Sequence, residues 1–454
     1  MKRVKASITL FEYDYLGKSS DTKCSVSTIK GISDKAFEYL EAQCLSGSLS
    51  CLRLKSFQGQ RVLQTQNYAG VIVTPFGDYI EILPKLAKKM EANKARQSLL
   101  HMLSYLGSFR HLQTQETSIN SAKMPLLEIF ISQFLDCLSQ LVTQGLRSHY
   151  VAQQENTAFV KGKLLIREQL RHNFINRHHF FTEYDEYMQN RPENRLLHTA
   201  LSKVGTCIRT RENQRKHQEL KQYFEKIPLS SSIKNDMGTV NIDRSMKHYR
   251  PSLSWAELIL NSLSPLSMRG SSAAFSLLFP MEAVFESYVA SLLRKDLPDK
   301  FSLKTQTQDR CLTSYDNASY FRLKPDLLIQ QHHDDSLPIN HMVLDTKWKM
   351  INSSQNSQGR KFGLSQDDFY QLFAYGHKYL SGSGCLVLIY PYHEGFQDPL
   401  PNAFEFSDRE ESLQLWVVPF KIGSNTKSGQ ILWPAGLSPY HLKSKNTDTN
   451  EVSA

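Results

Sequence analysis

The chain has 454 residues, 40% of them hydrophobic, with ten more Lys and Arg than Asp and Glu and seven scattered cysteines in no CxxC pair. This length suffices for two or three packed domains, and the basic surplus suits a partner rich in phosphate groups. The apolar runs are too short to span a bilayer, the N-terminus lacks a signal core, and the cysteines fit neither a disulfide framework nor a zinc site, so we expect a cytoplasmic protein without a membrane partner.

Residues 1–60 give few signals beyond one helix predicted within Ile32–Leu45. The tripeptide at Gly17 is similar to the end of a phosphate-binding P-loop, but Glu12 stands where that motif requires its first glycine. No other stretch matches the motif. We therefore expect this chain to bind no nucleotide itself, and any NTP hydrolysis belongs to a partner.

Residues 61–86 predict a β-hairpin, because two apolar or alternating segments flank a Pro and Gly reversal. Two helices are predicted next, over Leu86–Leu106 and Pro125–Leu146. In the second, apolar residues recur every three or four positions. Such a stripe predicts a core face, with a docking face as the alternative.

Residues 150–265 mix strand and helix signals. Phe159–Ile166 predicts a strand with a glycine turn. Charged and amphipathic periodicity predicts three helices, over Asn190–Ile208, Arg209–Lys226 and Trp255–Leu263. The Ser-, Pro- and Gly-rich stretch Ser264–Ser272 predicts a domain boundary.

Two short strands are predicted over Tyr320–Ile329 and His341–Lys349, joined by the polar turn Gln330–Asn340. The strands Cys385–Tyr390 and Leu413–Val418 follow, each with a continuous apolar run. Strands that alternate with helices predict an α/β (α+β) multidomain protein whose C-terminal domain has a mixed sheet flanked by helices.

The two short strands bring three charged side chains together. Side chains two apart share a face of a strand, so Asp345 and Lys347 point the same way, and pairing brings Asp326 to them. Two carboxylates suit a hard divalent cation, Mg²⁺ with Mn²⁺ as the alternative, and a nearby lysine can position an attacking water. This trio predicts phosphodiester hydrolysis; the alternative is a surface hairpin with solvated charges.

Helices flank this trio on both sides. A predicted helix over Phe279–Val289 carries Glu286, and one over Gln366–Gly376 places Gln371 and Tyr375 on one face. The order of an acidic helix, Pro-Asp, Asp-Thr-Lys and a QxxxY helix resembles the PD-(D/E)XK nuclease superfamily, and its QxxxY helix resembles the branch of RecB-type nucleases.

Four sequence segments resemble the McrC family more narrowly: LKPDLLI, VLDTKWK and DDFYQLFAYGHKY, with YAGVIV nearer the N-terminus. This resemblance implies the nuclease subunit of a McrBC modified-DNA restriction system, acting on double-stranded DNA. Its implied partner is a hexameric McrB-like AAA+ GTPase that recognises methylated DNA and is stimulated by the N-terminal part of McrC.

The chemistry of the trio and the resemblance together suggest roles, and the composition and predicted elements suggest domain boundaries. Asp326, Asp345 and the Thr346 carbonyl bind metal, and Lys347 supports the nucleophile. Glu286 binds a second metal or orients a metal-bound water, while Gln371 and Tyr375 hold the DNA backbone or support Lys347. The expected domains are a β and helical motor-docking part, a mixed helical middle region, the endonuclease domain and a polar, partly disordered tail, over 1–150, 151–264, 265–422 and 423–454.

Two other functions remain open at this point. One is a stand-alone Mg²⁺-dependent DNA nuclease without a motor. The other is a non-catalytic adaptor that only stimulates a GTPase. The sequence leaves open the modified base, the number of metal ions, the cleavage position and the stoichiometry with the motor.

Overall fold

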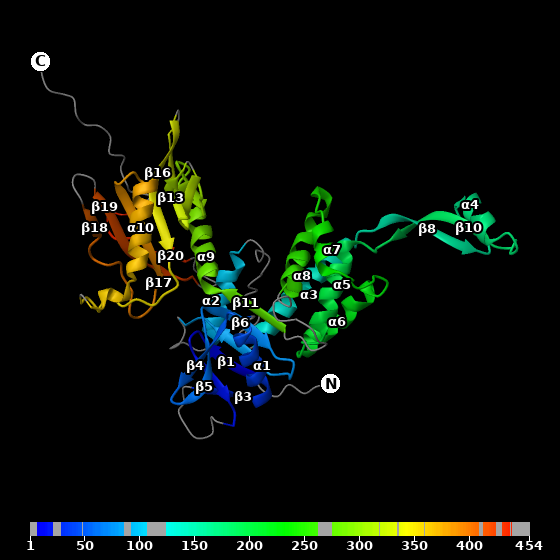
Figure 1. The fold of residues 1–454 in the computed structure, drawn as a ribbon, viewed down its shortest axis with the longest axis horizontal. Helices are drawn as coiled ribbons and strands as arrows, with labels where there is room; N and C mark the ends of the chain where they lie inside the picture. The colour runs from blue at the N-terminus through cyan, green and yellow to red at the C-terminus, as the bar shows by residue number, and fades with distance from the viewer. Residues whose placement is uncertain are drawn as a thin grey trace, which may run out of the picture. The chain divides into compact units, whose positions relative to one another are not determined.

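The protein combines several separate β-sheets with helices, which confirms the predicted mixed α+β class (Figure 1). This computed structural model describes residues 7–20, 29–47, 49–85, 92–106, 124–261, 275–316, 318–333, 336–357, 359–407, 412–423, 429–435 and 437. The chain forms two compact units, one of Met1–Val71, Phe76–Lys123 and Leu278–Ala454, the other of Ile72–Pro75 and Met124–Leu277. The boundaries predicted at 150, 264 and 422 stay predictions, and Ser264–Ser272 lies outside the described residues.

The N-terminal part of the first unit is built on two four-stranded sheets, in the orders β3-β2-β5-β4 and β1-β7-β6-β11. Its elements are β1 (Ser7–Phe11), β2 (Tyr15–Lys18), β3 (Ile29–Ile32), α1 (Asp34–Leu45), β4 (Leu52–Phe57), β5 (Gln60–Thr65), β6 (Tyr68–Val73), β7 (Tyr79–Leu83), α2 (Ala92–Ser104) and β11 (Phe275–Pro280). The predicted neighbours β6 and β7 are confirmed, as is the helix at α1. The predicted helix from Leu86 begins at Ala92 among the described residues.

The C-terminal part of the same unit is a seven-stranded mixed sheet of order β12-β15-β16-β17-β19-β18, with β20 on β19. Its elements, with the separate pair β13 and β14, are α9 (Met281–Asp296), β12 (Phe301–Thr305), β13 (Arg310–Tyr315), β14 (Ala318–Leu323), β15 (Leu327–His333), β16 (Ser336–Thr346), η6 (Lys361–Gly363), α10 (Gln366–Tyr379), β17 (Gly384–Pro391), β18 (Phe404–Ser407), β19 (Ser412–Lys421) and β20 (Gln430–Ile431). The central strands β16, β17 and β19 are parallel, and β15 is antiparallel to β16.

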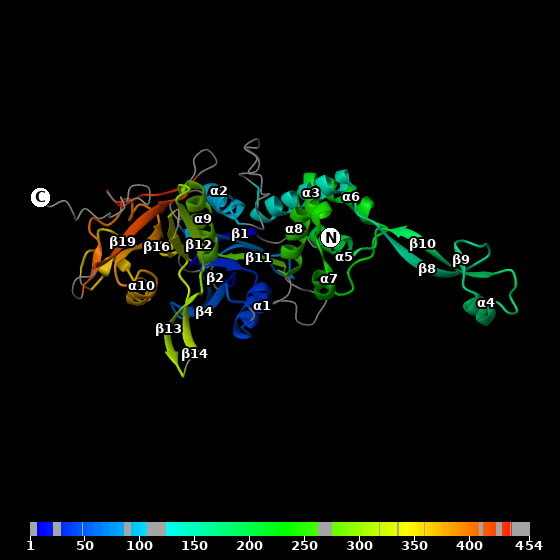
Figure 2. The same ribbon diagram turned by 90° about the horizontal axis from the view of Figure 1, so that it is seen from above.

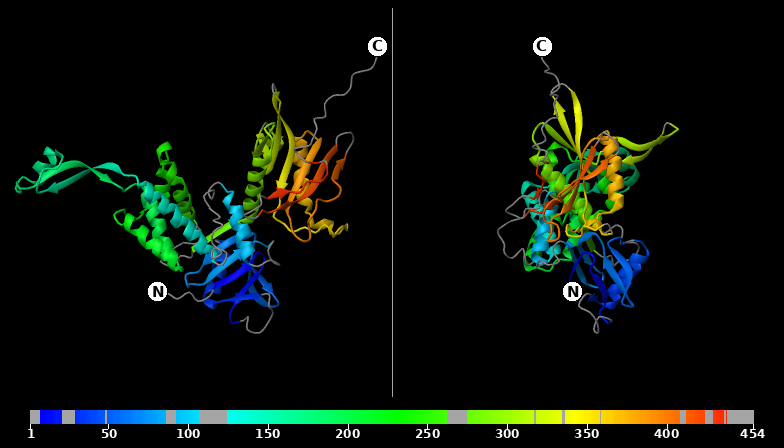
Figure 3. Two further views of the ribbon diagram at one scale, coloured as in Figure 1. Left: turned by 180° about the vertical axis from the view of Figure 1, so that it is seen from behind. Right: turned by 90° about the vertical axis from the view of Figure 1, so that its left-hand side faces the viewer.

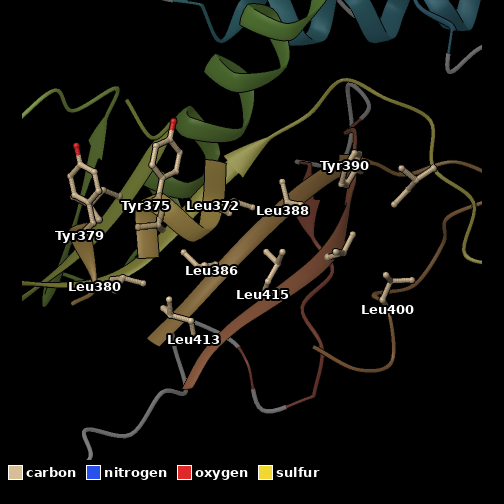
Figure 4. Packing of buried hydrophobic residues seen from close by; sticks show 14 of the residues in the cluster. Leu372, Tyr375, Tyr379, Leu380, Leu386, Leu388, Tyr390, Leu400, Leu413 and Leu415 are labelled. Atoms are coloured by element: carbon tan, nitrogen blue, oxygen red, sulfur yellow. The ribbon is translucent and has the colours of Figure 1, made fainter. Parts of the chain in front are cut away.

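Helices α9 and α10 cover opposite faces of this sheet (Figure 3). On the α10 side, Leu372 and Tyr375 pack with leucines that point from β17 and β19, as Figure 4 shows. Gly376 lets α10 approach closely, because a Cβ there would lie 2.6 Å from Leu413. On the other side, Phe285 of α9 packs edge-on against Phe420. Burial on both faces explains the continuous apolar runs of these strands.

The predicted loop Gln330–Asn340 is wrong, because β15 and β16 run on through most of it. Its polar residues satisfy one another across the strands, with the Gln330 side-chain amide donating to Asn340 Oδ1 at 2.7 Å. The predicted strand Tyr320–Ile329 is also corrected, since it breaks at Lys324-Pro325-Asp326. Its first half is β14, which among the described strands pairs with β13 alone, and Asp326 stands just before β15.

The second unit has a helical core and a two-stranded arm. Its elements are α3 (Leu126–Gln144), β8 (His149–Thr157), β9 (Lys163–Leu164), α4 (Ile166–His172), β10 (Phe180–Met188), α5 (Pro192–Gly205), α6 (Arg211–Phe224), α7 (Ile233–Thr239), η5 (Arg244–Tyr249) and α8 (Arg250–Asn261). Helix α3 packs against α6 and α8, which confirms its apolar stripe as a core face. By length and composition alone, this core helix could also cross a membrane.

The arm consists of β8 and β10, paired antiparallel from His149↔Met188 to Thr157↔Phe180, with α4 near its tip (Figure 2). The predicted strand Phe159–Ile166 is wrong in extent, because only Lys163–Leu164 pairs with β10 and Ile166 already begins α4. Its glycine turn is present: Gly162 has φ +78°, and a Cβ would lie 2.4 Å from the Glu183 carbonyl oxygen.

The polar stretch from residue 423 also contributes to the sheet, through β20. Residues 438–454, where the prediction of disorder falls, lie outside the described residues. Across the described chain the cysteines are free thiols, as the sequence predicts.

A buried hydrogen bond ties the N-terminal sheets to the C-terminal sheet within the first unit. Glu12, fully buried after β1, accepts the indole N–H of Trp348 at 3.0 Å and the backbone N–H of Lys85 at 2.8 Å. Trp348 lies just beyond β16 and packs against Phe285 of α9. Burial raises the pKa of Glu12 from 4.5 to about 7, against the hydrogen bonds that favour the ionised form.

The raised pKa of Glu12 makes the stability of the fold depend on pH. The folded protein keeps a proton on Glu12 where the unfolded chain releases it, so the group's stabilising contribution is complete below pH 4.5 and is lost as pH rises through about 7. We expect Glu12→Gln to flatten the fall in unfolding free energy over this range, measured by urea denaturation at a series of pH values. The control is Glu38→Gln at an exposed site; an unchanged slope in Glu12→Gln would contradict the assignment.

Candidate active site

Asp345 lies at the end of β16, inside the seven-stranded sheet. Its backbone is fixed on both sides, by the β15 pair Leu327↔Leu344 and by the β17 pair Asp345↔Leu388. The side chain is only 1% exposed, and its Oδ1 atom accepts no hydrogen bond among the described residues. A carboxylate buried in this way needs a cation or a proton.

Asp326 reaches the same strand end from the turn before β15. Its Oδ2 atom accepts the Thr346 backbone N–H at 2.8 Å and the Thr346 hydroxyl at 2.9 Å. Hydrogen bonds to a carboxylate are shorter and stronger than neutral ones. They fix Asp326 beside Asp345, so the two carboxylates meet as the sequence predicts.

Lys347 is the cation of the group. Its Nζ atom lies 2.6 Å from Asp345 Oδ2 and 3.2 Å from Gln371 Oε1, to which it donates. Burial alone would lower the pKa of Lys347, but the carboxylates of Asp345, Asp368 and Asp326 together raise it. The lysine is therefore charged and held in place.

The charge balance of the group is unequal. Burial and, next to it, the negative charge of Asp326 raise the pKa of Asp345, Lys347 opposes both, and the resulting pKa is about 7. One ammonium thus faces several carboxylates, which is the electrostatic setting that a divalent cation would complete.

Glu286 approaches from α9. Its Oε1 atom accepts the side-chain amide N–H of Gln306 at 2.8 Å. Burial raises the pKa of Glu286, and the charge of Asp326 adds to the effect. This carboxylate is close enough to sense Asp326, whereas no group of three acidic, His or Cys residues in the described chain is arranged to hold an ion alone.

Gln371 and Tyr375 on α10 form a relay from the lysine to the chain before Asp326. The Gln371 amide N–H donates to the Tyr375 hydroxyl at 2.6 Å, and that hydroxyl donates to the Lys324 carbonyl oxygen at 2.9 Å. Of the two predicted roles, these contacts favour support of Lys347. They also hold the turn that presents Asp326.

Asp368 is a site residue that sequence reasoning missed. It is buried in the first turn of α10 and contacts Lys349 Nζ at 3.1 Å and Lys347 Nζ at 3.8 Å. It also accepts the Tyr390 hydroxyl at 3.4 Å. The available signal was its spacing, since Asp368 precedes Gln371 and Leu372 by three and four positions and so shares their face.

The carboxylate pair suits an open Mg²⁺ site better than a site in which protein ligands fill every position of the ion. Mg²⁺ is usually bound by one or two carboxylates, with waters and substrate phosphate filling its other positions. Asp326 and Asp345 supply such a pair, and the unbonded Asp345 Oδ1 gives it a free acceptor.

The chain matches the model of the family described as McrBC 5-methylcytosine restriction system component, over residues 63–391. This range exceeds two thirds of the chain and contains every site residue above. None of the curated proteins matches the chain.

Two solved structures have similar chains. One is the refined half-complex from the tetradecameric assembly of Thermococcus gammatolerans McrB AAA+ hexamers with bound McrC, at 19% identity and TM-score 0.64, covering 92% of this chain and 95% of that one. The other is the cryo-EM structure of the Thermococcus gammatolerans McrBC complex, at 19% identity and TM-score 0.45, covering 63% and 87%. The first shows that the fold is shared over nearly the whole chain.

Mg²⁺ should stabilise the fold through Asp345. With the ion at about a hundredfold excess over its Kd, the unfolding free energy of the wild type should rise by about 2.7 kcal/mol. Asp345→Asn should remove most of this gain, because the buried anionic ligand is lost. Thermal and urea unfolding with and without Mg²⁺ test this, with Asp316→Asn at an exposed turn as the control. A full Mg²⁺ response in Asp345→Asn would place the ion elsewhere.

Proposed function

Because the chain belongs to the family of McrBC 5-methylcytosine restriction system components, we propose that it is the nuclease subunit of such a system. In this proposal it is a Mg²⁺-dependent endodeoxyribonuclease of PD-(D/E)XK fold that cleaves methylated double-stranded DNA with an McrB-like AAA+ GTPase, which it stimulates. One observation carries the nuclease role: Asp326 and Asp345 meet at a strand end with Lys347 Nζ 2.6 Å from Asp345.

Asp326 and Asp345 would hold the Mg²⁺ ion. When bound, Mg²⁺ supplies a Lewis acid for the phosphate and a water of lowered pKa. Lys347, charged and fixed by Gln371, orients the attacking water and stabilises the negative charge that grows on the phosphate. Glu286 is available beside Asp326 to orient a further water. Burial of Asp345 keeps bulk water away from the ion-binding oxygen.

The sequence predicts motor docking by residues 1–150, but the exposed arm of the second unit, residues 149–188, leads us to propose the arm as the motor-docking element instead. Each of its two strands has nine residues, which gives a length of about 30 Å. Near its tip several large apolar side chains are exposed, namely Phe159, Val160, Leu164, Ile166, Leu170, Phe174 and Ile175. Apolar patches of this kind mark protein contacts. An arm of this length and width suits insertion into the central channel of a hexameric ring.

Two alternative functions make different demands. A stand-alone nuclease requires no docking element and would cut DNA with Mg²⁺ in the absence of any NTP. A pure adaptor requires no buried carboxylate pair beside a lysine. The arm disfavours the first alternative and the carboxylate pair disfavours the second.

The nuclease role is tested through Lys347. We expect Lys347→Ala to lower the rate of cleavage of methylated plasmid about 10²- to 10³-fold, because a charge positioned at the transition state is lost. The assay contains the motor, GTP and Mg²⁺, with unmethylated plasmid in parallel. GTPase stimulation should stay at the wild-type level.

Lys378→Ala, at an exposed position in the last turn of α10, is the matched control and should cleave normally. If Lys347→Ala cleaved DNA at the wild-type rate, the assignment of the active site to Lys347 would be wrong. Cleavage by the wild type without motor or GTP would favour the stand-alone nuclease.

The motor-docking role is tested through the arm. We expect Phe174→Ser with Ile175→Ser to weaken motor binding about tenfold or more, since two exposed apolar anchors are lost. GTPase stimulation should fall in parallel, measured as a titration of this chain into the motor. Leu229→Ser, an exposed leucine outside the arm, is the control. Unchanged stimulation by the arm variant would show that the motor binds elsewhere.

A further inference from the structure

A second two-stranded element, β13 with β14, projects from the C-terminal part of the first unit (Figure 2). We call residues 310–316 and 318–323 the ribbon. Among the described strands, its two strands pair only with each other, from Arg310↔Leu323 to Tyr315↔Ala318. Nearly every described residue of the ribbon is exposed, on both faces of the strand pair. An isolated hairpin of this kind is marginally stable in water, so its persistence requires an anchor or a partner.

The ribbon is anchored at the active site itself. Where it returns, the Tyr379 hydroxyl donates to the Leu323 carbonyl oxygen at 3.3 Å, and the Lys324 carbonyl is held by Tyr375. Where it departs, the Gln306 backbone N–H donates to the Asp326 carbonyl oxygen at 3.0 Å. The same glutamine binds Glu286 through its side chain. Both ends of the ribbon are thus fixed to the residues that hold the carboxylate pair.

The exposed side chains of the ribbon include three aromatic rings and two arginines beside small polar and aliphatic residues. Tyr315 is 75% exposed and Tyr320 45%, with ring centroids 6.4 Å apart. Thr313 pairs with Tyr320, and alternation along β13 puts Tyr315 on the same face as Tyr320. Arg322 is exposed as well. Phe321 is 72% exposed and has φ +55°, a conformation that bulky residues rarely adopt.

Charge decides which partner this surface suits. Between residues 310 and 324 the basic residues Arg310, Arg322 and Lys324 outnumber the single acidic residue Asp316. Neither arginine forms a salt bridge with any residue that the structure describes, so both guanidinium groups are available to a polyanion. Guanidinium groups bind phosphate through parallel hydrogen bonds, and aromatic rings pack against sugars and bases.

We propose that the ribbon is a DNA-gripping element that lies in the major groove of the duplex beside the phosphate being cut. A two-stranded β-ribbon fits that groove, which is about 12 Å wide. The arginines contact the flanking phosphates and the tyrosines contact the groove wall. The ribbon thereby sets the position of the duplex on the carboxylate pair. This inference rests on the proposed nuclease function.

The test measures DNA binding apart from cleavage. The full chain carrying Asp345→Asn, which should not cut, is titrated into a short fluorescein-labelled duplex while anisotropy is followed. Adding Tyr315→Ser with Tyr320→Ser should weaken binding about fivefold or more. Adding Arg310→Gln with Arg322→Gln should weaken binding and reduce the slope of log K against log salt by about 2.

Matched controls use side chains of the same kinds on α6. Tyr223 is 58% exposed and the Arg215 side chain 83%. Tyr223→Ser with Arg215→Gln should leave DNA affinity unchanged. Circular dichroism and unfolding curves check that the ribbon variants fold, as expected for substitutions of exposed side chains.

The outcomes separate this inference from the function on which it rests. If both ribbon variants bound DNA with the affinity and salt slope of the Asp345→Asn parent, the ribbon's role would be overturned, even if the wild type cleaves. A changed sedimentation coefficient without DNA, together with parental DNA affinity, would instead assign the ribbon to contact with a second copy of the chain. If the ribbon variants bind DNA weakly but the wild type never cleaves, the ribbon's role stands and the nuclease proposal falls.

Discussion

Two carboxylates at one edge of a sheet, served by a single ammonium, are the constraint to which the surrounding structure responds. Asp345 is buried by the sheet, and Asp326 is locked beside it by two hydrogen bonds from Thr346. Lys347 offsets part of this negative charge. In a low dielectric such an imbalance is costly unless every partner is fixed, because displacement of one charge leaves the others unpaired.

The neighbouring elements supply that fixation from three directions. Helix α10 holds Lys347 and the turn before Asp326 through one amide and one hydroxyl, Gln371 and Tyr375. Helix α9 brings Glu286 to the same edge. The N-terminal sheets reach the strand end through Glu12, whose buried carboxylate binds the indole of Trp348. The local order of β16 therefore depends on contacts from segments far away in the sequence.

The split between what was predictable and what was not follows from the range of these contacts. The partnership of Asp345 and Lys347 follows from alternation along one strand, and that of Gln371 and Tyr375 from one helical turn, so a short pattern suffices for each. Glu12 acts through packing of distant segments, which no local period encodes, whereas the helical spacing of Asp368 from Gln371 gives its face but not its lysine partners. The polar residues after Ile329 predict a loop from the sequence, because the partners that make them strand residues lie across the sheet.

The same reasoning explains how the arm and the ribbon persist in the described part of the chain, although both are exposed. A ribbon with both faces in water gains little from burial, so it persists only where its base is fixed. The arm is fixed at its base to a helical core. The ribbon is fixed at its base by hydrogen bonds to the backbone carbonyls of Lys324 and Asp326. Large apolar side chains are exposed at the tip of the first, together with basic ones such as Lys163 and Arg171, whereas tyrosines and arginines mark the second. That difference suits a protein channel for the arm and a polyanion for the ribbon, which would divide motor contact and DNA contact between the two compact units.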